Sequence, residues 1–243
     1  MSQTKKIDLN ILGERFSIFD ELNSMTGKYI EKELNDAIYT QCFERVKAQP
    51  VGMVLDIGAH VGTFSILANK KVTYTHLVAV EPAPYNFENL VKNIELNCVE
   101  ATTVPYAISN HPIDKMILDT SNTGATQLVG VIKDYENYPY LKSFKIDKTI
   151  TLNELFEQYV KFSRVSLMKL DIEGAEYQAL EGFKYWNQVD TLMFEIHWDT
   201  LPFKKESSYA ALNMLQHVLN HLKPEQVFAA LPFVKYYAGK YGP

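Results

Sequence analysis

Short apolar runs, each ending in an acidic residue or a glycine turn, recur through the middle of the chain. The clearest run is Met-Val-Leu-Asp-Ile at residues 53–57, which meets Gly58 and is followed by a stretch compatible with a helix. This pattern predicts a buried strand, a tight turn and a helix N-terminus. Four more strands are predicted in the same way, at residues 77–81, 102–108, 165–171 and 191–197.

Helical patterns separate these predicted strands. They cover residues 63–70, 84–97, 151–161, 174–183 and 207–222. Thr151 and Glu154 have the spacing of a capping box. Strands that alternate with helices predict an α/β fold with a doubly wound, mostly parallel sheet, whose ligands bind at the carboxyl ends of the strands. Residues 227–231 and 233–237 predict a closing antiparallel pair.

The first fifty residues predict an extension of this core. Apolar and polar residues alternate on both sides of Leu12-Gly13-Glu14, which predicts a β-hairpin over residues 7–20 at the edge of the domain. Residues 29–47 have apolar side chains at helical spacing and predict one amphipathic helix, which either helps to cover a cofactor or only packs on the sheet. We therefore expect an extension at residues 1–50 and a core domain at residues 51–243.

Residues 110–148 form the least regular part of the predicted core. A small and polar stretch is followed by four aromatic residues, Tyr135, Tyr138, Tyr140 and Phe144. Segments of this kind between core elements often form a lid or a substrate wall, and tyrosine rings suit a sugar face or an apolar ring. The alternative is a hairpin with surface tyrosines. We expect an insert on the substrate side.

The composition excludes several classes of partner. The net charge of the 243-residue chain is −5, which does not suit a broad surface for nucleic acid or anionic membranes. Residues 1–10 lack the apolar segment of a signal peptide, and no apolar run approaches the roughly 20 residues of a membrane span. Cys42 and Cys98 match no metal or redox spacing and predict free thiols in a reducing compartment. We expect a cytoplasmic protein without a nucleic-acid or membrane partner.

The turn after the first core strand has the chemistry of a ligand site. Asp56, Gly58 and Gly62 form the pattern Asp-x-Gly-x-x-x-Gly, which lacks the middle glycine of the dinucleotide fingerprint and disfavours an NAD-linked oxidoreductase. The free N–H groups of the following helix favour a carboxylate or a phosphate. Glu81, at the end of the next strand, can accept both hydroxyls of a ribose and would repel a ribose phosphate. Asp56 either faces a ligand or is held by turn amides.

Three stretches together resemble the FkbM-type family of S-adenosylmethionine (SAM)-dependent methyltransferases. The matching residues are Leu55-Asp56-Ile57-Gly58-Ala59 with Gly62, Val80-Glu81-Pro82, and Lys169-Leu170-Asp171-Ile172-Glu173-Gly174-Ala175-Glu176. Phe194-Glu195-Ile196-His197 resembles the acidic strand end that follows in that family. The resemblance implies a Rossmann-like methyltransferase fold with a seven-stranded sheet and SAM as cofactor. It also implies a small hydroxyl-bearing acceptor, such as a sugar or a glycosylated or polyketide-like metabolite.

The strand ends and the resemblance together give the candidate site residues. The cofactor set is Asp56, Gly58, Ala59, His60, Gly62, Thr63, Phe64, Glu81, Pro82 and Ala107. Asp171 is the first candidate for a base that assists a hydroxyl acceptor, and Glu195 and His197 are the second. Asp171 and Glu195 could instead hold a divalent ion. Structural alternatives are that Asp56 braces the turn, His60 lines the loop, Glu173 and Glu176 cap a helix, and His197 is a core histidine.

Two further functions stay open at this point. A methyltransferase with a nitrogen or carbon acceptor needs only a different pocket. A non-catalytic SAM-binding module would keep Asp56 and Glu81 but would not need acidic or titratable groups at Asp171, Glu195 and His197.

Overall fold

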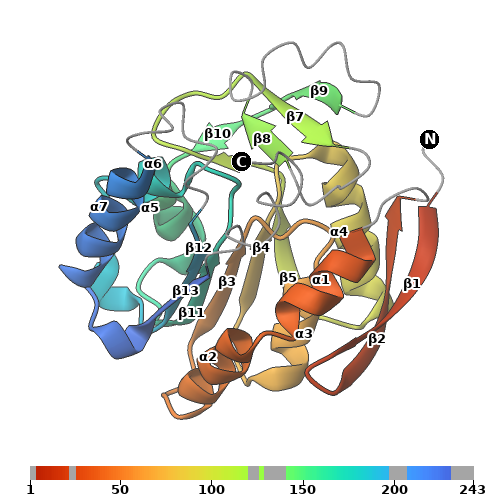
Figure 1. Cartoon of the computed structure of the whole chain (residues 1–243), viewed down its shortest axis with the longest axis horizontal. Helices are drawn as coiled ribbons and strands as arrows, with labels where there is room; N and C mark the ends of the chain where they lie inside the picture. Colours follow the sequence, from red (N-terminus) through yellow and green to blue (C-terminus); the bar gives the residue numbers. More distant parts are fainter. Residues whose placement is uncertain (1–3, 22–25, 120–125, 129–140, 197–206, 231–243) are drawn as a thin grey trace, which may run out of the picture.

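A six-stranded parallel sheet forms the centre of the molecule (Figure 1). The computed structural model describes residues 4–21, 26–119, 126–128, 141–196 and 207–230. The order of the sheet is β13-β12-β11-β3-β4-β5, and every neighbouring pair is parallel. The strands are β3 (Met53–Ile57), β4 (Leu77–Val80), β5 (Ala101–Val104), β11 (Val165–Leu170), β12 (Leu192–Glu195) and β13 (Val227–Ala230). The predicted doubly wound α/β fold is confirmed.

Helices cover both faces of this sheet, so its strands are buried on both sides. One face carries α3 (Thr63–Lys71) and α4 (Pro84–Leu96). The other carries α5 (Leu152–Leu155) with the π-helical turn η2 (Phe156–Val160), α6 (Glu176–Leu180), the short turn η3 (Trp186–Gln188) and α7 (Ser207–Leu219). Successive strand residues alternate between the two hydrophobic clusters. Val54 packs with the first group of helices and Leu55 with the second.

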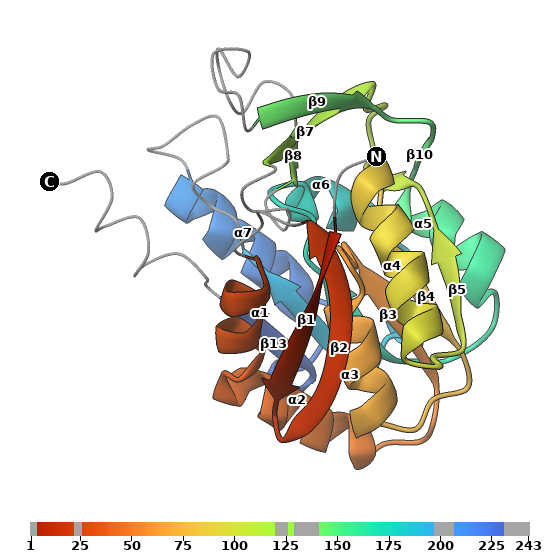
Figure 2. The same ribbon diagram turned by 90° about the vertical axis from the view of Figure 1, so that its right-hand side faces the viewer.

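The N-terminal hairpin is present and forms a sheet of its own. β1 (Thr4–Ile11) pairs antiparallel with β2 (Glu14–Glu21), and the two turn residues, Leu12 and Gly13, both have positive φ. Figure 2 shows the hairpin on the outer side of α3 and α4. Its buried side chains, Ile11 and Ile18 among them, belong to the same hydrophobic cluster as α3.

The single helix predicted for residues 29–47 is wrong, because two helices occupy this range. These are α1 (Thr26–Leu34) and α2 (Ala37–Lys47). The break lies at Asn35-Asp36, where the Asp36 side chain accepts a hydrogen bond from the Ile38 N–H at 3.0 Å. An aspartate in this role starts a new helix. The apolar spacing continues across the break and therefore conceals it.

The predicted strand at residues 102–108 is also divided. β5 ends at Val104, and β6 (Ala107–Ile108) pairs instead with β10 (Thr149–Ile150). Pro105 lies at the break and has no N–H to donate to a strand partner. The chain between β6 and β10 forms an antiparallel sheet of β7 (Lys115–Asp119), β8 (Thr126–Leu128) and β9 (Leu141–Lys145), at the top of Figure 1. The expected lid tyrosines Tyr135, Tyr138 and Tyr140 lie outside the described residues.

The C-terminal part of the described chain adds the outer strand β13 to the parallel sheet. After the short turn η4 (Pro224–Gln226), β13 runs parallel to β12. Its predicted antiparallel partner at residues 233–237 lies outside the described residues, as would a seventh strand. Across the parts of the chain that the structure describes, no helix is long and apolar enough to cross a membrane.

Helix α4 buries polar residues that its apolar spacing does not predict. Besides Leu90 and Ile94, its buried residues are three asparagines, Asn86, Asn89 and Asn93. They lie three and four positions apart and therefore share one face of the helix.

Asn93 joins the hairpin to the loop after β3. Its side-chain oxygen accepts from the Phe19 N–H at 2.6 Å. Its amide nitrogen donates to the carbonyls of Phe19 at 2.9 Å and Val61 at 2.8 Å. One fully buried side chain thus satisfies backbone groups of two distant segments.

We expect Asn93→Ala to lower the free energy of unfolding by about 2–4 kcal/mol, because it leaves several backbone groups without partners. Urea unfolding of the purified protein measures this loss. Lys92→Ala, at an exposed position of the same helix, is the control and should change stability little. Equal stability of the two variants would show that the Asn93 hydrogen bonds contribute nothing net.

Candidate functional site

The candidate site lies where the winding of the sheet reverses. From β3 the chain proceeds towards β4 on one side, and from the adjacent β11 it proceeds towards β12 on the other. In open parallel sheets, ligands bind beyond the carboxyl ends of the strands at such a point. The turn residues there come very close together. A Cβ on Gly58, whose φ is +82°, would lie 1.6 Å from the carbonyl oxygen of Asp171. Gly58 is therefore required by the packing of the two strand ends, in addition to its predicted role towards a ligand.

The buried ammonium of Lys169 forms the centre of this region. Its Nζ donates to Asp171 Oδ2 at 2.8 Å and to the Gly58 carbonyl at 3.2 Å, and it lies 3.9 Å from Asp56 Oδ1. Burial by itself lowers the pKa of Lys169, but Asp171 and Asp56 outweigh it and hold the pKa well above its ordinary value. The ammonium also lies 5.7 Å from the centre of the Phe64 ring. Lys169 is thus a fixed positive charge among carboxylates.

Asp56 is held by Lys169 and by the side chain and backbone of Ser65 in the first turn of α3. It is fully buried, and its Oδ2 accepts from the Ser65 hydroxyl at 2.6 Å. Burial raises its pKa, and Lys169 and Ser65 oppose that rise. These contacts agree with the structural alternative for Asp56, in which its carboxylate braces the turn after β3. A direct contact with a ligand stays a prediction.

The turn that follows Asp171 is tied down by Glu176. The buried Glu176 carboxylate accepts from the Ile172 N–H at 3.0 Å and the Gly174 N–H at 3.1 Å. Glu173 and Gly174 both have positive φ, so the backbone turns sharply before α6. The side chain of Asp171 is half-buried beside this turn. Glu176 thus fixes the backbone turn beside Asp171. This agrees with the structural alternative for Glu176, in which it caps the following helix.

Glu195 meets residues of the N-terminal extension. It ends β12 and is buried. The Tyr39 hydroxyl, on α2, lies 3.3 Å from Glu195 Oε1 and 3.0 Å from Glu33 Oε1, at the end of α1. The helices α1 and α2 of the N-terminal extension thus bring Glu33 and Tyr39 to the acidic end of β12. His197, the third candidate catalytic residue, lies outside the described residues.

Glu81 joins the loops after β3 and β4. It accepts from the backbone N–H of His60 at 3.0 Å, from that of Ala83 at 3.0 Å and from the Asn86 amide at 3.4 Å. Burial raises the pKa of Glu81 to about 7, and these donors limit the rise. A carboxylate oxygen has two lone pairs, so the same group can still accept the hydroxyls of a ribose.

The remaining residues of the cofactor set are in the same two loops. The Ala59 N–H donates to the Val80 carbonyl at 2.9 Å, which holds the loop against β4. His60 has a φ of +52°, and burial lowers its pKa. Gly62 has a φ of +89° at the start of α3, and a Cβ there would lie 2.8 Å from the side chain of Leu90. Gly62 thus allows close packing of α3 on α4.

The first turn of α3 and the start of the next loop complete this set. Thr63 begins α3, and its buried hydroxyl has no hydrogen-bond partner among the residues that the structure describes. Phe64 stacks on Phe43 of α2, with ring centres 5.7 Å apart. Pro82 follows Glu81 and is half-buried. The structure therefore brings Thr63, Phe64 and Pro82 to the loops that carry the rest of the cofactor set.

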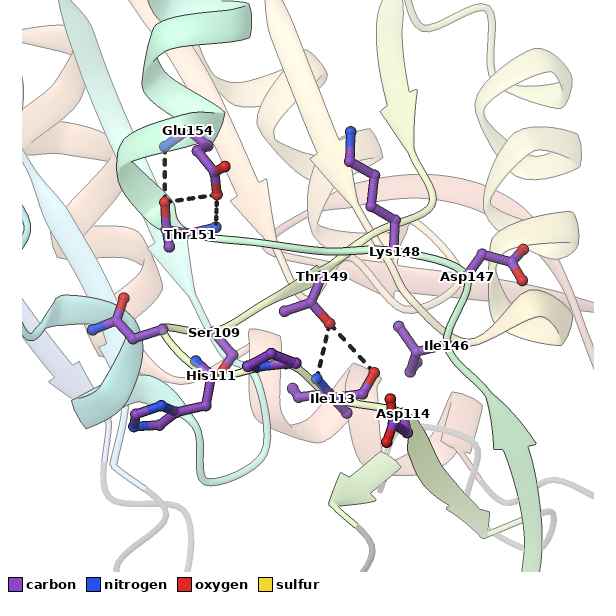
Figure 3. Close-up of a pocket in the computed structure, with 12 residues that line it drawn as sticks. Ser109, His111, Ile113, Asp114, Ile146, Asp147, Lys148, Thr149, Thr151 and Glu154 are labelled. Carbon is purple, nitrogen blue, oxygen red and sulfur yellow. Dashed lines mark hydrogen bonds between the residues drawn. The ribbon is translucent and has the colours of Figure 1, made fainter.

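Ala107 stands apart from the other predicted cofactor residues. It is buried in the β6–β10 pair and packs with Met116 and Ile146 under the insert. A hollow of about 340 Å³ lies beyond this pair, lined mainly by polar residues such as Ser109 (Figure 3). Thr149 closes one wall through hydrogen bonds with the backbone of Ile113. A contact between Ala107 and an adenine ring stays a prediction.

The divalent-ion alternative gains no support from the described residues. No three His, Cys, Asp or Glu side chains in that part of the chain are arranged to hold a metal ion. The ammonium of Lys169 already supplies positive charge to Asp171.

Sequence reasoning gave no role to Lys169, Tyr39, Glu33 or Asn86. Lys169 was identifiable, because residues two apart on a strand share a face, and this places it with Asp171. The roles of Glu33 and Tyr39 follow from the helix break between them, which the apolar spacing conceals. Asn86 lies on a helix face whose burial only the packing reveals.

Known proteins share sequence with this chain over most of its length. The model of the family described as the Methyltransferase FkbM domain matches residues 56–226. "Methyltransferase 1" of Beauveria bassiana (strain ARSEF 2860) is 22% identical over 215 residues, which cover 81% of this chain and 83% of that protein. "Methyltransferase sdnD" of Sordaria araneosa is 23% identical over 214 residues, which cover 76% of this chain and 80% of that protein.

Solved structures give shorter alignments. A 16S rRNA methyltransferase of T. thermophilus (RsmC), in complex with AdoMet and guanosine, is 19% identical with a TM-score of 0.35, over 43% of this chain and 28% of that one. TYW2 of M. jannaschii, in complex with AdoMet, is 17% identical with a TM-score of 0.30, over 46% of this chain and 53% of that one. The family match spans more than half of the sequence and includes the loops and strand ends described above. This chain therefore belongs to the FkbM methyltransferase family.

Proposed function

We propose that this methyltransferase uses SAM to methylate a hydroxyl of a small molecule, such as a sugar or a glycosylated or polyketide-like metabolite. The observation that supports this most is the group of the buried Lys169 and Glu195 with the half-buried Asp171 at the carboxyl ends of β11 and β12. A protonated hydroxyl is a weak nucleophile and needs a group that takes up its proton. The acceptor class rests on the family resemblance.

The loops after β3 and β4 fit SAM. The first turn of α3 offers N–H groups, which suit the carboxylate of the methionine part. The partnerless Thr63 hydroxyl lies in the same turn. Glu81 lies one loop away and suits the ribose hydroxyls. We assign the predicted cofactor residues of these two loops to SAM binding.

Bound SAM supplies a methyl group on a positively charged sulfur. Because this group is already activated, the protein mainly aligns the acceptor oxygen with it. Lys169 keeps Asp171 ionised at 2.8 Å, which favours Asp171 as the hydrogen-bond acceptor that orients the hydroxyl. Glu195 lies 3.3 Å from the Tyr39 hydroxyl and is the stronger candidate to receive the proton.

SAM affinity should depend on pH through Glu81. Its pKa is about 7 without ligand, and only its ionised form accepts both ribose hydroxyls. Affinity should therefore fall as the pH decreases below about 7, by up to about tenfold per pH unit, and level off above it. Calorimetric titration with SAM across this range measures the effect.

Glu81→Gln should bind SAM at least about tenfold more weakly, with the pH dependence lost. Glu88→Gln, an exposed position on α4, is the matched control and should behave like the wild type. Wild-type affinity that does not change with pH would remove Glu81 from the ribose site.

Asp171→Asn keeps the shape of the side chain and removes its charge. We expect turnover to fall by roughly 100-fold or more, with a hydroxyl acceptor found in a screen of sugars. SAM affinity should change much less. A lower melting temperature with normal turnover of the folded fraction would instead mean that Asp171 only braces the strand end.

Removal of divalent ions should leave turnover unchanged. The reason is that the buried Lys169 ammonium already supplies positive charge beside Asp171. The wild-type enzyme is dialysed against EDTA and assayed with the same acceptor. Activity that disappears on chelation and returns with added Mg²⁺ or Mn²⁺ would contradict the assignment.

A further inference from the structure

The Tyr39 hydroxyl lies between two carboxyl groups from different parts of the chain. It is 3.0 Å from Glu33 Oε1, on α1, and 3.3 Å from Glu195 Oε1, on β12. A hydroxyl has one hydrogen to donate and can otherwise only accept. An ionised carboxylate can only accept. The Tyr39 hydrogen can be shared between the two oxygens, but a protonated carboxyl group allows each contact to be a full hydrogen bond. The Glu33 and Glu195 side chains also hydrogen-bond to each other, which two ionised carboxylates cannot do. The geometry therefore favours one proton held among the three groups.

Burial changes along this row of groups. Glu195 is 5% exposed and Tyr39 is 1% exposed, whereas Glu33 is an exposed residue. Tyr39 is further fixed by its ring, which lies 6.3 Å from the ring centre of Phe64. The row thus connects the buried end of β12 with a side chain that water reaches.

The surrounding charges determine where the extra proton resides. Desolvation by the neighbouring protein groups raises the pKa of Glu33, although the residue as a whole is exposed to solvent. Asp171 raises this pKa further, while hydrogen bonds to Glu195 and Tyr39 and the charge of Lys169 lower it. Burial and the nearby carboxylates hold the pKa of Tyr39 well above its ordinary value. Tyr39 therefore stays a neutral hydroxyl, and Glu33 is the favoured holder of the extra proton.

We propose that Glu195, Tyr39 and Glu33 form a proton relay that removes the proton of the acceptor hydroxyl during methyl transfer. The proposal rests on the function proposed above. Glu195 is the catalytic residue of the relay, because it meets the acceptor, and Tyr39 and Glu33 act through it as positioning residues. The relay makes α1 and α2 of the N-terminal extension part of the methyl-transfer site.

The step is balanced in atoms and electrons. The acceptor oxygen forms a bond to the methyl carbon, the bond from that carbon to sulfur breaks, and its electron pair stays on sulfur. The acceptor proton moves to the ionised Glu195. Glu33 then releases its proton to water, the Tyr39 hydroxyl passes its hydrogen to Glu33, and Tyr39 takes the proton of Glu195. The relay returns to its starting state with one proton released.

The first test needs no acceptor. NMR of the whole protein with carboxyl-labelled glutamate follows each glutamate through a pH titration. Glu33→Gln, Glu195→Gln and Glu81→Gln assign the resonances. We expect Glu33 to titrate above the ordinary glutamate range and to be coupled to Glu195. Tyr39→Phe keeps the ring, removes the hydroxyl and should weaken the coupling, of which the direct contact between Glu33 and Glu195 keeps a part. Two independent titrations in the ordinary range, or coupling unaltered in Tyr39→Phe, would overturn the relay.

The second test measures turnover with the same sugar acceptor. Tyr39→Phe and Glu33→Gln should each lower turnover by about tenfold or more and remove one ionisation from its pH profile, with SAM affinity unchanged. Glu44→Gln makes the same substitution on α2, at an exposed carboxylate that pairs with Lys47, and should match the wild type. Normal turnover and an unchanged pH profile in Tyr39→Phe would overturn the proposal, even if its melting temperature falls.

The two proposals fail separately. Calorimetry that detects no SAM binding to the wild type refutes the proposed function, whatever the glutamates do. SAM binding together with ordinary, uncoupled titration of Glu33 and Glu195 refutes the relay alone.

Discussion

The ion pair between Lys169 and Asp171 is the interaction on which the site depends. The ammonium is buried where β3 and β11 end, and carboxylates from both strands surround it. An isolated charge in such a place is very unfavourable, and so is an isolated carboxylate. Together with the Gly58 carbonyl they compensate one another. Loss of any one member would leave the others as uncompensated charges at the bottom of the site.

The register of two strands determines this pairing. Lys169 is opposite Asp56 in the parallel ladder, and Leu170 is opposite Ile57. Side chains alternate between the faces of a strand, so a shift of one residue would move Lys169 to the other face. Met168 and Leu170, on either side of Lys169, are fully buried in the same hydrophobic cluster, and they hold the register in place. Hydrophobic packing thus sets the geometry of the charged centre.

Most of the sheet could be predicted from sequence, because buried strands with a glycine or acidic end have a strong local pattern. The loops at Gly58 and Glu81 could be placed for the same reason. The division of α1 from α2 could not, since the Asp36 cap lies within a continuous apolar spacing. The roles of Glu33 and Tyr39 depend on a fold that joins residues more than a hundred positions apart, and local spacing has no information about that.

The Asn93 side chain has a consequence for how binding and folding are related. Its one amide group donates to the carbonyl of Phe19 in the hairpin and to that of Val61 in the loop after β3. Any ligand that orders the loop therefore also favours the docked hairpin, and by thermodynamic reciprocity the docked hairpin favours the ligand to the same extent. The N-terminal hairpin would then act as an effector, because its detachment would weaken ligand binding at a distance. The Asn93 hydrogen bonds that couple the two events touch none of the predicted cofactor residues.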